Sequence, residues 1–381
     1  MGFLVLGAGS MGRAIAYDLS RSPKVLHVRI VDNEEGKAEG VARDLASPKV
    51  SHGTLDVTDH DGVVRAMSGV DVAISCVPYR FNYDLAVAAV EAGTGFCDLG
   101  GNNDIVRKEL ILDKKAKDAG ITIIPDCGLA PGLVSILAAN ALERMDKLTE
   151  LHFRVGGLPM NPRPPLDYMI VFSPAGLINE YTEKTVIIRR GKVMTVDSMD
   201  DLEEIEFPEP FGKLEAFNTS GGTSTLPQTF HGKVDVLDYK TIRYPGHCEK
   251  VKCMMELGLF DEVPITIDGN PVVPRNVTET LLANNLSYED DDVVLLRAWA
   301  EGTMDGEERT LTYTIIDHCD KEHGITAMQR MTAFPASIVA QMMATGAIAE
   351  TGAIPQELVV PTARFCEELE RRGVKLDIVI D

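Results

Sequence analysis

The feature that most constrains the fold is a glycine-rich segment near the N-terminus, "GAGSMG". It follows the short apolar run "GFLVLG" and opens a helical pattern that extends to about Arg21. Between a strand and a helix, the first glycine of G-x-G-x-x-G permits a tight turn, the second lets the backbone approach a pyrophosphate, and the third allows close helix–strand packing. The helix N-terminus adds free N–H groups for phosphate oxygens. The segment predicts a dinucleotide site formed by Gly7, Ala8, Gly9, Ser10, Met11 and Gly12.

An acidic residue lies where this type of site contacts a ribose. Asp32 closes the next predicted strand, "HVRIVD", twenty residues after Gly12. A carboxylate at this position accepts hydrogen bonds from ribose hydroxyls and repels a 2′-phosphate. Asn33 follows, where a site for NADP more often carries arginine. We therefore expect NAD as the cofactor, in preference to NADP.

Strand and helix patterns alternate through the first 126 residues. Apolar runs such as "DVAISCV" and "GITIIPD" are separated by helical segments. Strands that alternate with helices indicate βαβ units and a parallel sheet. Six such strands predict an α/β fold with a doubly wound parallel Rossmann sheet over residues 1–126.

The pattern changes after this first domain. A helix is expected from about Gly132 to Met145, and the strands that follow alternate apolar and polar residues, as in "KTVIIRRGKVMTV". Residues 127–326 are predicted to form a central α+β domain for substrate binding and dimerisation, because exposed sheet edges often pair between copies. Residues 327–381 are predicted to be helical and to complete the Rossmann domain. We expect a homodimer or a larger homo-oligomer.

The carboxyl ends of the predicted strands locate the site, since open α/β sheets bind ligands there. Those ends carry "SCVPYRFN", "CDLGGNND" and "PDCGLAPG". Tyr79 is expected to point toward the nicotinamide, whereas Asp98 and Asp126 are either site residues or caps of helices and turns. The cysteines at these ends are either site or core residues. Further residues expected along the cofactor are Asp56, Ser75, Cys76, Val77, Pro78, Leu99 and Gly100.

Composition argues against two classes of partner. The 381 residues carry a formal net charge of −21 with a pI near 4.8, whereas nucleic acids and anionic membranes call for a basic surface. The most apolar long segment, "MTAFPASIVAQMMATGAIA", contains Pro335 and Gln341 and predicts a buried helix, not a membrane span. The expected ligand is a small molecule.

Cysteine usage bears on compartment and metal. Seven scattered cysteines without a CxxC pattern, and no signal peptide, indicate a reduced cytoplasmic protein. Cys248 and Cys253 lie near His247, and His318 precedes Cys319, but these spacings match no tetrahedral zinc pattern. We therefore expect no metal.

Residues 239–252, "YKTIRYPGHCEKVK", gather positive charge beside a tight turn in this acidic chain. Two interpretations stand at this point: an exposed strand and turn with a solvated face, or an anion-binding site. The basic residues are Lys240, Arg243, His247, Lys250 and Lys252, with Glu249 as the single acid among them.

Several longer segments make the chain similar to the saccharopine dehydrogenase-related oxidoreductases and, among these, most similar to the lysine 6-dehydrogenases. "GGLPMNPRPP", "TSGGTSTL" and "TIRYPGH" are far more specific to this group than the glycine motif. "CDLGGN", "IIPDCGLAPGLVSILA" and "FSPAGLINEYT" also match, and the resemblance extends to about residue 300 and more weakly to the end. It implies a Rossmann domain completed by C-terminal helices, a central domain that closes over the crevice, usually a dimer, and oxidation at a C–N bond of an amino acid.

Oxidation of an amine by NAD sets requirements that particular residues can meet. Arginine suits an α-carboxylate because its planar fork binds both oxygens, and Arg243 is the first candidate, with Arg154 as the second. Asp98 or Asp126 is a candidate to meet an ammonium. His247 is the candidate proton carrier, because the ordinary pKa of histidine lies near working pH.

Each candidate has an alternative reading. Arg243 could pair with Asp235 or Glu249 at the surface, and His247 could merely follow a turn. The loop over residues 219–225 offers N–H groups and hydroxyls that could fix the substrate or cover the cofactor, or it could be structural. Lys250 and Lys252 could form a solvated helix face. The catalytic candidates are thus His247, Asp98 and Tyr79, and the substrate-binding candidates are Arg243, Arg154, Asp126, Thr219 and Ser220.

The resemblance implies NAD-dependent oxidative deamination of L-lysine at its ε-amine. The products are NADH, ammonia and a semialdehyde that cyclises to piperideine-6-carboxylate. The visible cations suit one carboxylate better than the three of saccharopine. Arg154, Arg163 and Arg243 could nevertheless converge, so a saccharopine or carboxynorspermidine-type dehydrogenase acting on a secondary amine stays open. An alternative of another class is a non-catalytic NAD-binding sensor or assembly protein. The intact glycine motif argues against this alternative.

Overall fold

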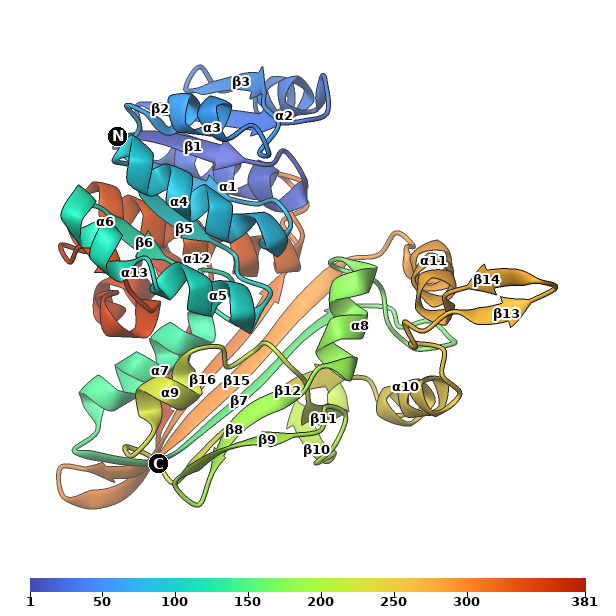
Figure 1. The fold of residues 1–381 in the computed structure, drawn as a ribbon. Coiled ribbons are helices and arrows are strands. Elements are labelled where there is room, and N and C mark those ends of the chain that lie inside the picture. The colour runs from blue at the N-terminus through green and yellow to red at the C-terminus, as the bar shows by residue number, and fades with distance from the viewer. The chain divides into compact units, whose positions relative to one another are not determined.

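A seven-stranded parallel sheet organises the first of two units in the computed structural model, which describes residues 1–381. Its order is β17-β6-β5-β4-β1-β2-β3, so the chain starts near the middle and builds first one edge and then the other (Figure 1). Phe3, Leu4 and Val5 of the central strand are fully buried, as expected for a strand covered on both faces. The predicted doubly wound sheet is confirmed. The strands are β1 (Gly2–Leu6), β2 (His27–Asp32), β3 (Val50–Thr54), β4 (Val72–Ser75), β5 (Gly95–Asp98), β6 (Thr122–Ile124) and β17 (Gly352–Ala353).

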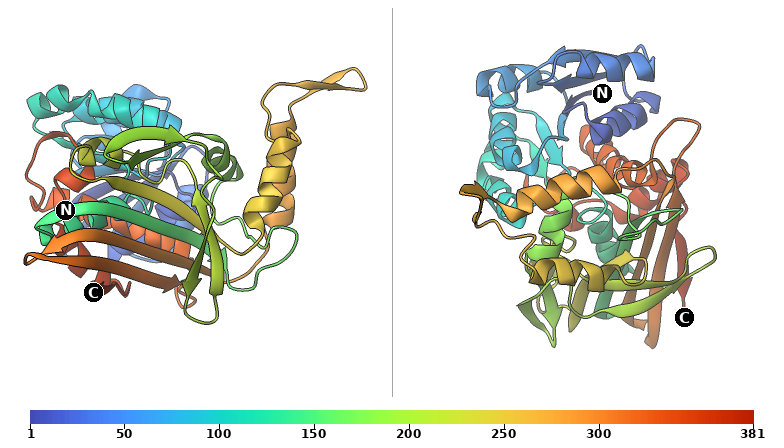
Figure 2. Two further views of the ribbon diagram at one scale, coloured as in Figure 1. Left: turned by 90° about the horizontal axis from the view of Figure 1, so that it is seen from below. Right: turned by 90° about the vertical axis from the view of Figure 1, so that its right-hand side faces the viewer.

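Helices cover both faces of this sheet. Val63 of α3, Leu85 of α4 and Ala116 of α6 join strand residues in one buried apolar cluster. On the opposite face α1 and α12 lie together (Figures 1 and 2), and the hydroxyl of Ser337 in α12 donates to buried Asp18 of α1. The helices are α1 (Ser10–Arg21), α2 (Lys37–Leu45), α3 (His60–Met67), η1 (Tyr79–Phe81), α4 (Asn82–Ala92), α5 (Asn103–Leu110), α6 (Asp113–Ala119), α7 (Leu133–Arg144), α12 (Ala327–Ala344), η2 (Gln356–Leu358) and α13 (Thr362–Arg371).

A nine-stranded mixed sheet organises the second unit. Strands β7, β15 and β16 pair antiparallel, whereas β12 runs parallel to β7. Along β7, buried Leu151, Phe153 and Val155 alternate with His152 and Arg154, the period of two that a strand imposes. The predicted α+β architecture is confirmed. The strands are β7 (Lys147–Pro159), β8 (Thr185–Arg189), β9 (Lys192–Val196), β10 (Glu203–Phe207), β11 (Gly212–Asn218), β12 (Val236–Arg243), β15 (Asp292–Met304), β16 (Glu307–His318) and β18 (Asp377–Ile380).

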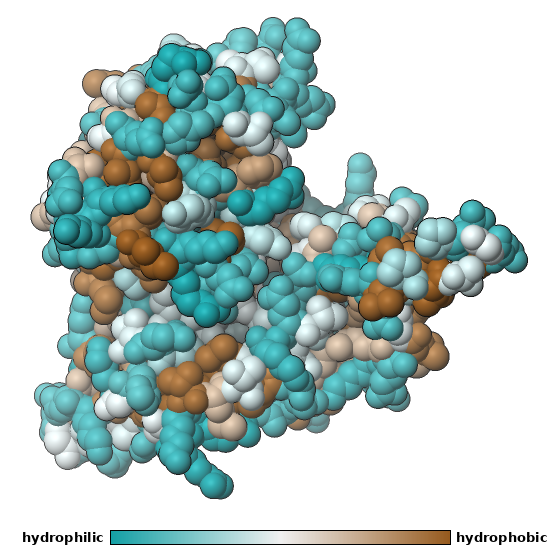
Figure 3. All heavy atoms as spheres, viewed as in Figure 1, coloured by the Kyte–Doolittle hydropathy of each residue, from teal (hydrophilic) through white to brown (hydrophobic).

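The second unit also carries helices and a small hairpin. The hairpin of β13 (Ile265–Ile267) and β14 (Asn270–Val272) projects beyond α11 (Pro274–Leu286) (Figure 2). Apolar residues gather on the surface over this part (Figure 3); those exposed are Leu257, Leu259, Val263, Ile265, Ile267, Val277 and Leu281. The other helices are α8 (Pro174–Thr182), α9 (Leu226–Phe230) and α10 (His247–Glu256).

We had predicted that residues 327–381 are helical, but this last part of the chain also contains two strands. It contains α12 and α13, but β17 extends the first sheet beside β6, and β18 pairs with β16 in the second. Strands of two and four residues are too short for a periodic pattern to reveal. The first unit comprises residues 1–144, 224–226 and 329–375, and the second comprises 145–223, 227–328 and 376–381.

The long apolar segment near residue 340 forms α12, as predicted. The helix has 18 residues with Pro335 inside it, and Ala333, Ala336 and Ala340 are fully buried. No helix of the structure combines the length and the apolar character that crossing a membrane requires.

Candidate active site

The glycine-rich turn joins β1 to α1 with a geometry suited to a dinucleotide. Gly7 has φ +103°, which side chains rarely adopt, and its N–H donates to the carbonyl of Val31 at 2.8 Å. A Cβ on Gly12 would collide with the carbonyl oxygen of Gly7, so the turn and the helix are in direct contact. No side chain caps α1 at Gly9, which leaves N–H groups of its first turn available to phosphate oxygens.

Asp32 ends β2 beside this turn. Its carboxylate accepts the N–H of Ala8 at 2.8 Å and that of Glu34 at 3.0 Å, and the ammonium of Lys37 lies 3.4 Å away. Burial alone raises the pKa of Asp32, but these contacts outweigh it and lower the pKa overall. The residue is therefore an anion at neutral pH, at the strand end where such sites contact the ribose. Asn33 beside it is exposed.

The ends of β1 and β4 meet where the strand order reverses. A Cβ on Gly7 would lie 3.0 Å from the carbonyl oxygen of Cys76 and 3.2 Å from a methyl group of Val77, so these residues lie directly beside the glycine turn. The hydroxyl of buried Ser75 donates to Asn82 at 2.7 Å and ties the end of β4 to the start of α4. Ligands of open α/β sheets bind at this reversal, which supports the predicted course of the cofactor along residues 75–78.

Other predicted cofactor residues occupy neighbouring strand ends. Tyr79 begins η1, and its half-buried ring packs against Gly101. Asp56 is exposed after β3 and accepts the N–H and the hydroxyl of Thr58. Their contacts with a cofactor stay predictions, as do those of the half-buried residues that follow β5, Leu99 and Gly100.

Three carboxyl groups meet inside the first unit. Asp98 at the end of β5, Glu109 of α5 and Asp126 beyond β6 are 0%, 0% and 3% exposed. One oxygen of Asp98 accepts the N–H of Gly100 at 2.6 Å and that of Asp126 at 3.3 Å. Its other oxygen, both oxygens of Glu109 and one of Asp126 have no hydrogen-bond donor. Three carboxylates cannot all remain ionised in such surroundings.

Burial raises the pKa values of all three acids, and their mutual repulsion adds to it for two of them. The pKa of Glu109 is raised to about 11 by burial and then by Asp98. The pKa of Asp126 is raised to about 8 by burial and by Asp98, against the lowering effect of the Ser224 hydroxyl. Burial also raises the pKa of Asp98. Glu109 therefore carries a proton at neutral pH, whereas Asp126 titrates in the range that suits general acid–base catalysis.

The hydroxyl partner of Asp126 comes from a loop that we predicted to bind substrate. Ser224, in "TSGGTST", donates to the carboxylate of Asp126. Ser224 was not among the predicted residues. The predicted Thr219 and Ser220 bond within the second unit: the hydroxyl of Thr219 lies 2.6 Å from that of Thr241, and the hydroxyl of Ser220 donates to a backbone carbonyl.

Arg243 ends β12 and is only 2% exposed within the second unit. Its Nε donates to the hydroxyl of Tyr181 at 3.0 Å, and Nη1 donates to the carbonyl of Ile242 at 2.9 Å. The guanidinium lies over the ring of Tyr168, 4.6 Å from its centroid. The carboxylate of Glu180 stands 3.8 Å from Nη2, beyond hydrogen-bond distance. The alternative of a surface ion pair for Arg243 is therefore wrong.

Both ring nitrogens of His247 are engaged, which argues against its predicted role as the proton carrier. The residue is 1% exposed; Nδ1 lies 2.9 Å from the carbonyl of Leu166 and Nε2 lies 3.0 Å from the hydroxyl of Tyr181. Because a carbonyl only accepts, Nδ1 carries the proton and Nε2 accepts from Tyr181. Burial, and then Arg243, lower the pKa of His247 to about 3. The neutral ring thus holds Tyr181, which in turn holds Arg243.

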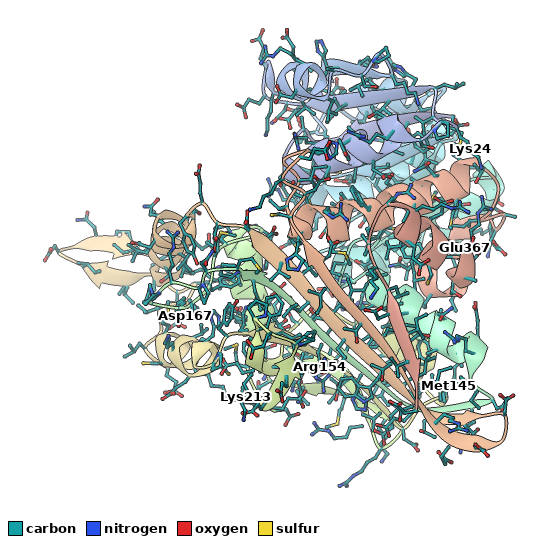
Figure 4. The ribbon with its side chains drawn as sticks, turned by 180° about the vertical axis from the view of Figure 1, so that it is seen from behind. Lys24, Met145, Arg154, Asp167, Lys213 and Glu367 are labelled. Atoms are coloured by element: carbon teal, nitrogen blue, oxygen red, sulfur yellow. The ribbon has the colours of Figure 1, made fainter.

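Arg154, the second candidate for the substrate carboxylate, is already bound to acids. It lies on β7 in the second sheet (Figure 4), and its guanidinium binds Glu203 and, at 2.6 Å, Asp238. It also lies over the ring of Trp299, and Lys240 binds Glu203 at 2.6 Å. These ion pairs argue against the predicted role of Arg154 in binding a substrate carboxylate. The remaining cations of the basic stretch lie on α10: exposed Lys250 pairs with Asp167, and half-buried Lys252 pairs with Asp200.

The same sheet brings a histidine between acids. Ligand atoms of Glu150, His152 and Glu301 all lie within 4.8 Å of one another. The ring nitrogens of His152 are 3.1 Å from Glu150 and 3.0 Å from Asp238. Burial lowers the pKa of His152, but both acids raise it more. Because both nitrogens are engaged, we describe this cluster as an ion-pair network of the sheet. It involves none of the cysteines weighed for zinc.

Comparison with protein families covers most of the chain. Residues 3–124 match the saccharopine dehydrogenase NADP binding domain, and residues 128–374 match the saccharopine dehydrogenase C-terminal domain. Among curated relatives, saccharopine dehydrogenase (NADP(+), L-glutamate-forming) of Schizosaccharomyces pombe is 21% identical and covers 98% of each chain. Carboxynorspermidine synthase of Vibrio cholerae is 23% identical, over 100% of this chain and 97% of that one.

Solved structures show the same fold. The apo saccharopine dehydrogenase (L-Glu forming) from Saccharomyces cerevisiae superposes with a TM-score of 0.82 at 21% identity and covers 100% of this chain and 99% of that one. The homospermidine synthase from Legionella pneumophila in complex with NAD has a TM-score of 0.68 at 13% identity and covers 100% and 91%. The chain is therefore an amino-acid dehydrogenase of the saccharopine dehydrogenase family, with an N-terminal nicotinamide dinucleotide-binding domain.

Proposed function

We propose that the protein oxidises the ε-amine of L-lysine with NAD and releases NADH, ammonia and the semialdehyde, which cyclises to piperideine-6-carboxylate. The observation that carries the proposal is the contrast between the two buried arginines of the second unit. Arg154 is neutralised by Glu203 and Asp238, whereas Arg243 has no carboxylate within hydrogen-bond distance. One available guanidinium suits a substrate with one carboxylate, and lysine has one where saccharopine has three.

The residues of the first unit fit NAD. The glycine turn and the uncapped N-terminus of α1 suit a pyrophosphate. The ionised carboxylate of Asp32 suits ribose hydroxyls and disfavours a 2′-phosphate. The matched domain and the Schizosaccharomyces pombe relative are both described with NADP, so Asp32 is the residue on which the proposed preference for NAD depends. NAD supplies the hydride acceptor when bound.

Asp126 replaces His247 as the proposed general base. With a pKa of about 8, its carboxylate is available in part at neutral pH to take a proton from the substrate ammonium or from the attacking water. Protonated Glu109 is uncharged, which keeps the charge of the cluster low. The overall reaction balances when the lysine ammonium, NAD and water give the aldehyde, an ammonium ion, NADH and one proton, which leaves through Asp126.

A second candidate follows from the names of the relatives. Saccharopine dehydrogenase and carboxynorspermidine synthase match nearly the whole chain, so oxidation or formation of a secondary amine is the alternative reaction. An enzyme of this kind would use the same cofactor and base but would require further cations for the additional carboxylates of its substrate. A protein that binds NAD without turnover is the alternative of another class.

The test is NADH absorbance with purified protein, NAD and a panel of lysine, ornithine, saccharopine, diaminobutyrate and carboxynorspermidine. Signal with L-lysine, accompanied by ammonia release, would support the proposal. If NADH forms with saccharopine or carboxynorspermidine, the assigned substrate changes, but the proposed reaction is still oxidation at a carbon–nitrogen bond. No signal from a protein that still binds NAD would favour the sensor.

We further propose that the working form is a cytoplasmic homodimer. All seven cysteines are free thiols, in keeping with a reducing compartment. The edge strand β18 exposes Ile378, Val379 and Ile380, and an exposed apolar edge favours pairing between copies. Light scattering on the purified protein would test the assembly, and a monomer at micromolar concentration would refute it.

A further inference from the structure

We propose that Glu180 and Arg243 together bind the α-ammonium and the α-carboxylate of the substrate, which makes Glu180 a specificity-determining residue of the second unit. This inference deepens the proposed function and rests on it. From the sequence we predicted that the ammonium binds at Asp98 or Asp126, and Glu180 was not among the predicted residues.

The two side chains carry opposite charges that face each other without forming a hydrogen bond. Nη2 of Arg243 and Oε2 of Glu180 are 3.8 Å apart, whereas charge-assisted bonds are about 2.7–2.9 Å long. Nε and Nη1 of Arg243 already donate within the protein, so the Nη2 side of the fork is the part left for a ligand. The side chain of Glu180 is 31% exposed against 3% for Arg243. Glu180 is therefore the solvent-facing member of the pair.

An α-amino acid complements this arrangement because it carries an anion and a cation on one carbon atom. With its carboxylate on Arg243 and its ammonium on Glu180, the four charges alternate in sign. Each charge of the pair then gains a hydrogen-bonded partner, which removes the cost of leaving the buried guanidinium without a close anion. A diamine satisfies only Glu180, and an ω-amino acid satisfies only Arg243.

The surroundings hold both groups in place before a ligand arrives. The hydroxyl of Tyr181 accepts from Arg243 and donates to His247, and the ring of Tyr168 lies against the guanidinium. Burial raises the pKa of Glu180 to about 7, although Arg243 opposes the shift, as expected for a carboxylate without a close cation. Groups fixed in this way lose little conformational freedom when a ligand binds.

The experiment compares L-lysine with 6-aminohexanoate, which keeps the reacting amine and the carboxylate but lacks the α-ammonium. For the wild-type protein we expect kcat/KM to favour L-lysine by roughly 10- to 100-fold, the value of a hydrogen bond between charged groups. Glu180→Gln should abolish this preference by lowering kcat/KM for L-lysine while leaving 6-aminohexanoate unchanged. Glu249→Gln is the matched control, because Glu249 is exposed in the same unit and its loss changes the net charge equally. Thermal unfolding verifies that both variants are folded.

The outcomes separate this inference from the proposed function. If the wild-type protein oxidises L-lysine and Glu180→Gln affects both substrates equally, or neither, the inference is refuted and the function stands. If the wild-type protein oxidises saccharopine and not L-lysine, the proposed substrate is refuted. The variants are then compared on saccharopine and its analogue without the α-ammonium, and an equal loss on both again refutes the inference. If it oxidises no amino acid, both proposals fall.

Discussion

Replacing Glu109 by glutamine tests whether Glu109 is protonated in the buried cluster that it forms with Asp98 and Asp126. Glu109 is fully buried, and neither of its oxygens has a donor. Glutamine has nearly the same volume and, like the protonated acid, is uncharged and carries a hydrogen-bond donor. The substitution therefore removes the titration of residue 109 with little change in packing.

The size of the effect follows from the pKa values. A glutamate in an unfolded chain titrates near 4.5, whereas Glu109 in the folded protein titrates near about 11. Folding must therefore bind a proton throughout this range, and each pH unit costs the wild-type protein about 1.4 kcal/mol of unfolding free energy. The contribution is fully present below 4.5 and is lost as the pH rises toward 11. Glutamine has no such loss, so the variant should gain about 3 kcal/mol relative to the wild type between about pH 6 and about pH 8.

The assay is denaturant unfolding of the intact chain, followed by circular dichroism at several pH values and analysed by linear extrapolation. Glu39→Gln serves as control, because Glu39 is an exposed helical glutamate and its replacement removes one carboxyl group outside the acid cluster. A difference between wild type and Glu109→Gln that is flat with pH would refute the reasoning, since it would mean that Glu109 is ionised in the folded protein.

Four further substitutions test other parts of the site and fold. Asp32→Ala should weaken NADH binding and reduce discrimination against NADPH in fluorescence titrations. If the ratio of the two affinities is unchanged, Asp32 does not contact the ribose. Arg243→Lys should raise KM for the amino acid roughly tenfold or more with little effect on KM for NAD, because lysine lacks the planar fork; equal changes would place the carboxylate elsewhere. His247→Gln should leave the pH profile of kcat unchanged. If the variant loses the fall of kcat on one side of the profile, His247 is the proton carrier after all. Arg372→Ala removes the partner of buried Asp18, bound at 2.8 Å, and should lower the unfolding free energy by about 3 kcal/mol; a loss below about 1 kcal/mol in denaturant titration would mark the ion pair as unimportant.

The first sheet was predictable because its signals are local. Glycine spacing, apolar runs and the helices between them are all properties of neighbouring residues, and they specify a parallel sheet with its ligand site at the strand ends. The strands β17 and β18 were missed because each is held by partners far along the chain. Residues 352–353 pair with β6, and residues 377–380 pair with β16.

Site residues divide in the same way. Asp98 and Asp126 could be proposed from the sequence because strand ends are marked in it, whereas Glu109, which lies in the same buried cluster, was missed. Its one signal is its place three residues after Val106, on the buried side of α5. Arg154 and His247 have suitable chemistry, but their roles depend on distant partners: the acids that bind Arg154 lie 49 and 84 residues away. Pairing at that range has no local pattern.

Each of the two units is assembled from separate stretches of the chain. The chain passes from one unit to the other five times, after residues 144, 223, 226, 328 and 375. A gene segment ending at residue 144 would lack the edge strand β17, the helices α12 and α13, and the hydroxyl of Ser224 that bonds Asp126. The dinucleotide-binding unit is therefore not encoded by one continuous stretch of the sequence. Truncation after residue 144 would remove parts of that unit itself, so it cannot be produced alone by shortening the chain at its first boundary.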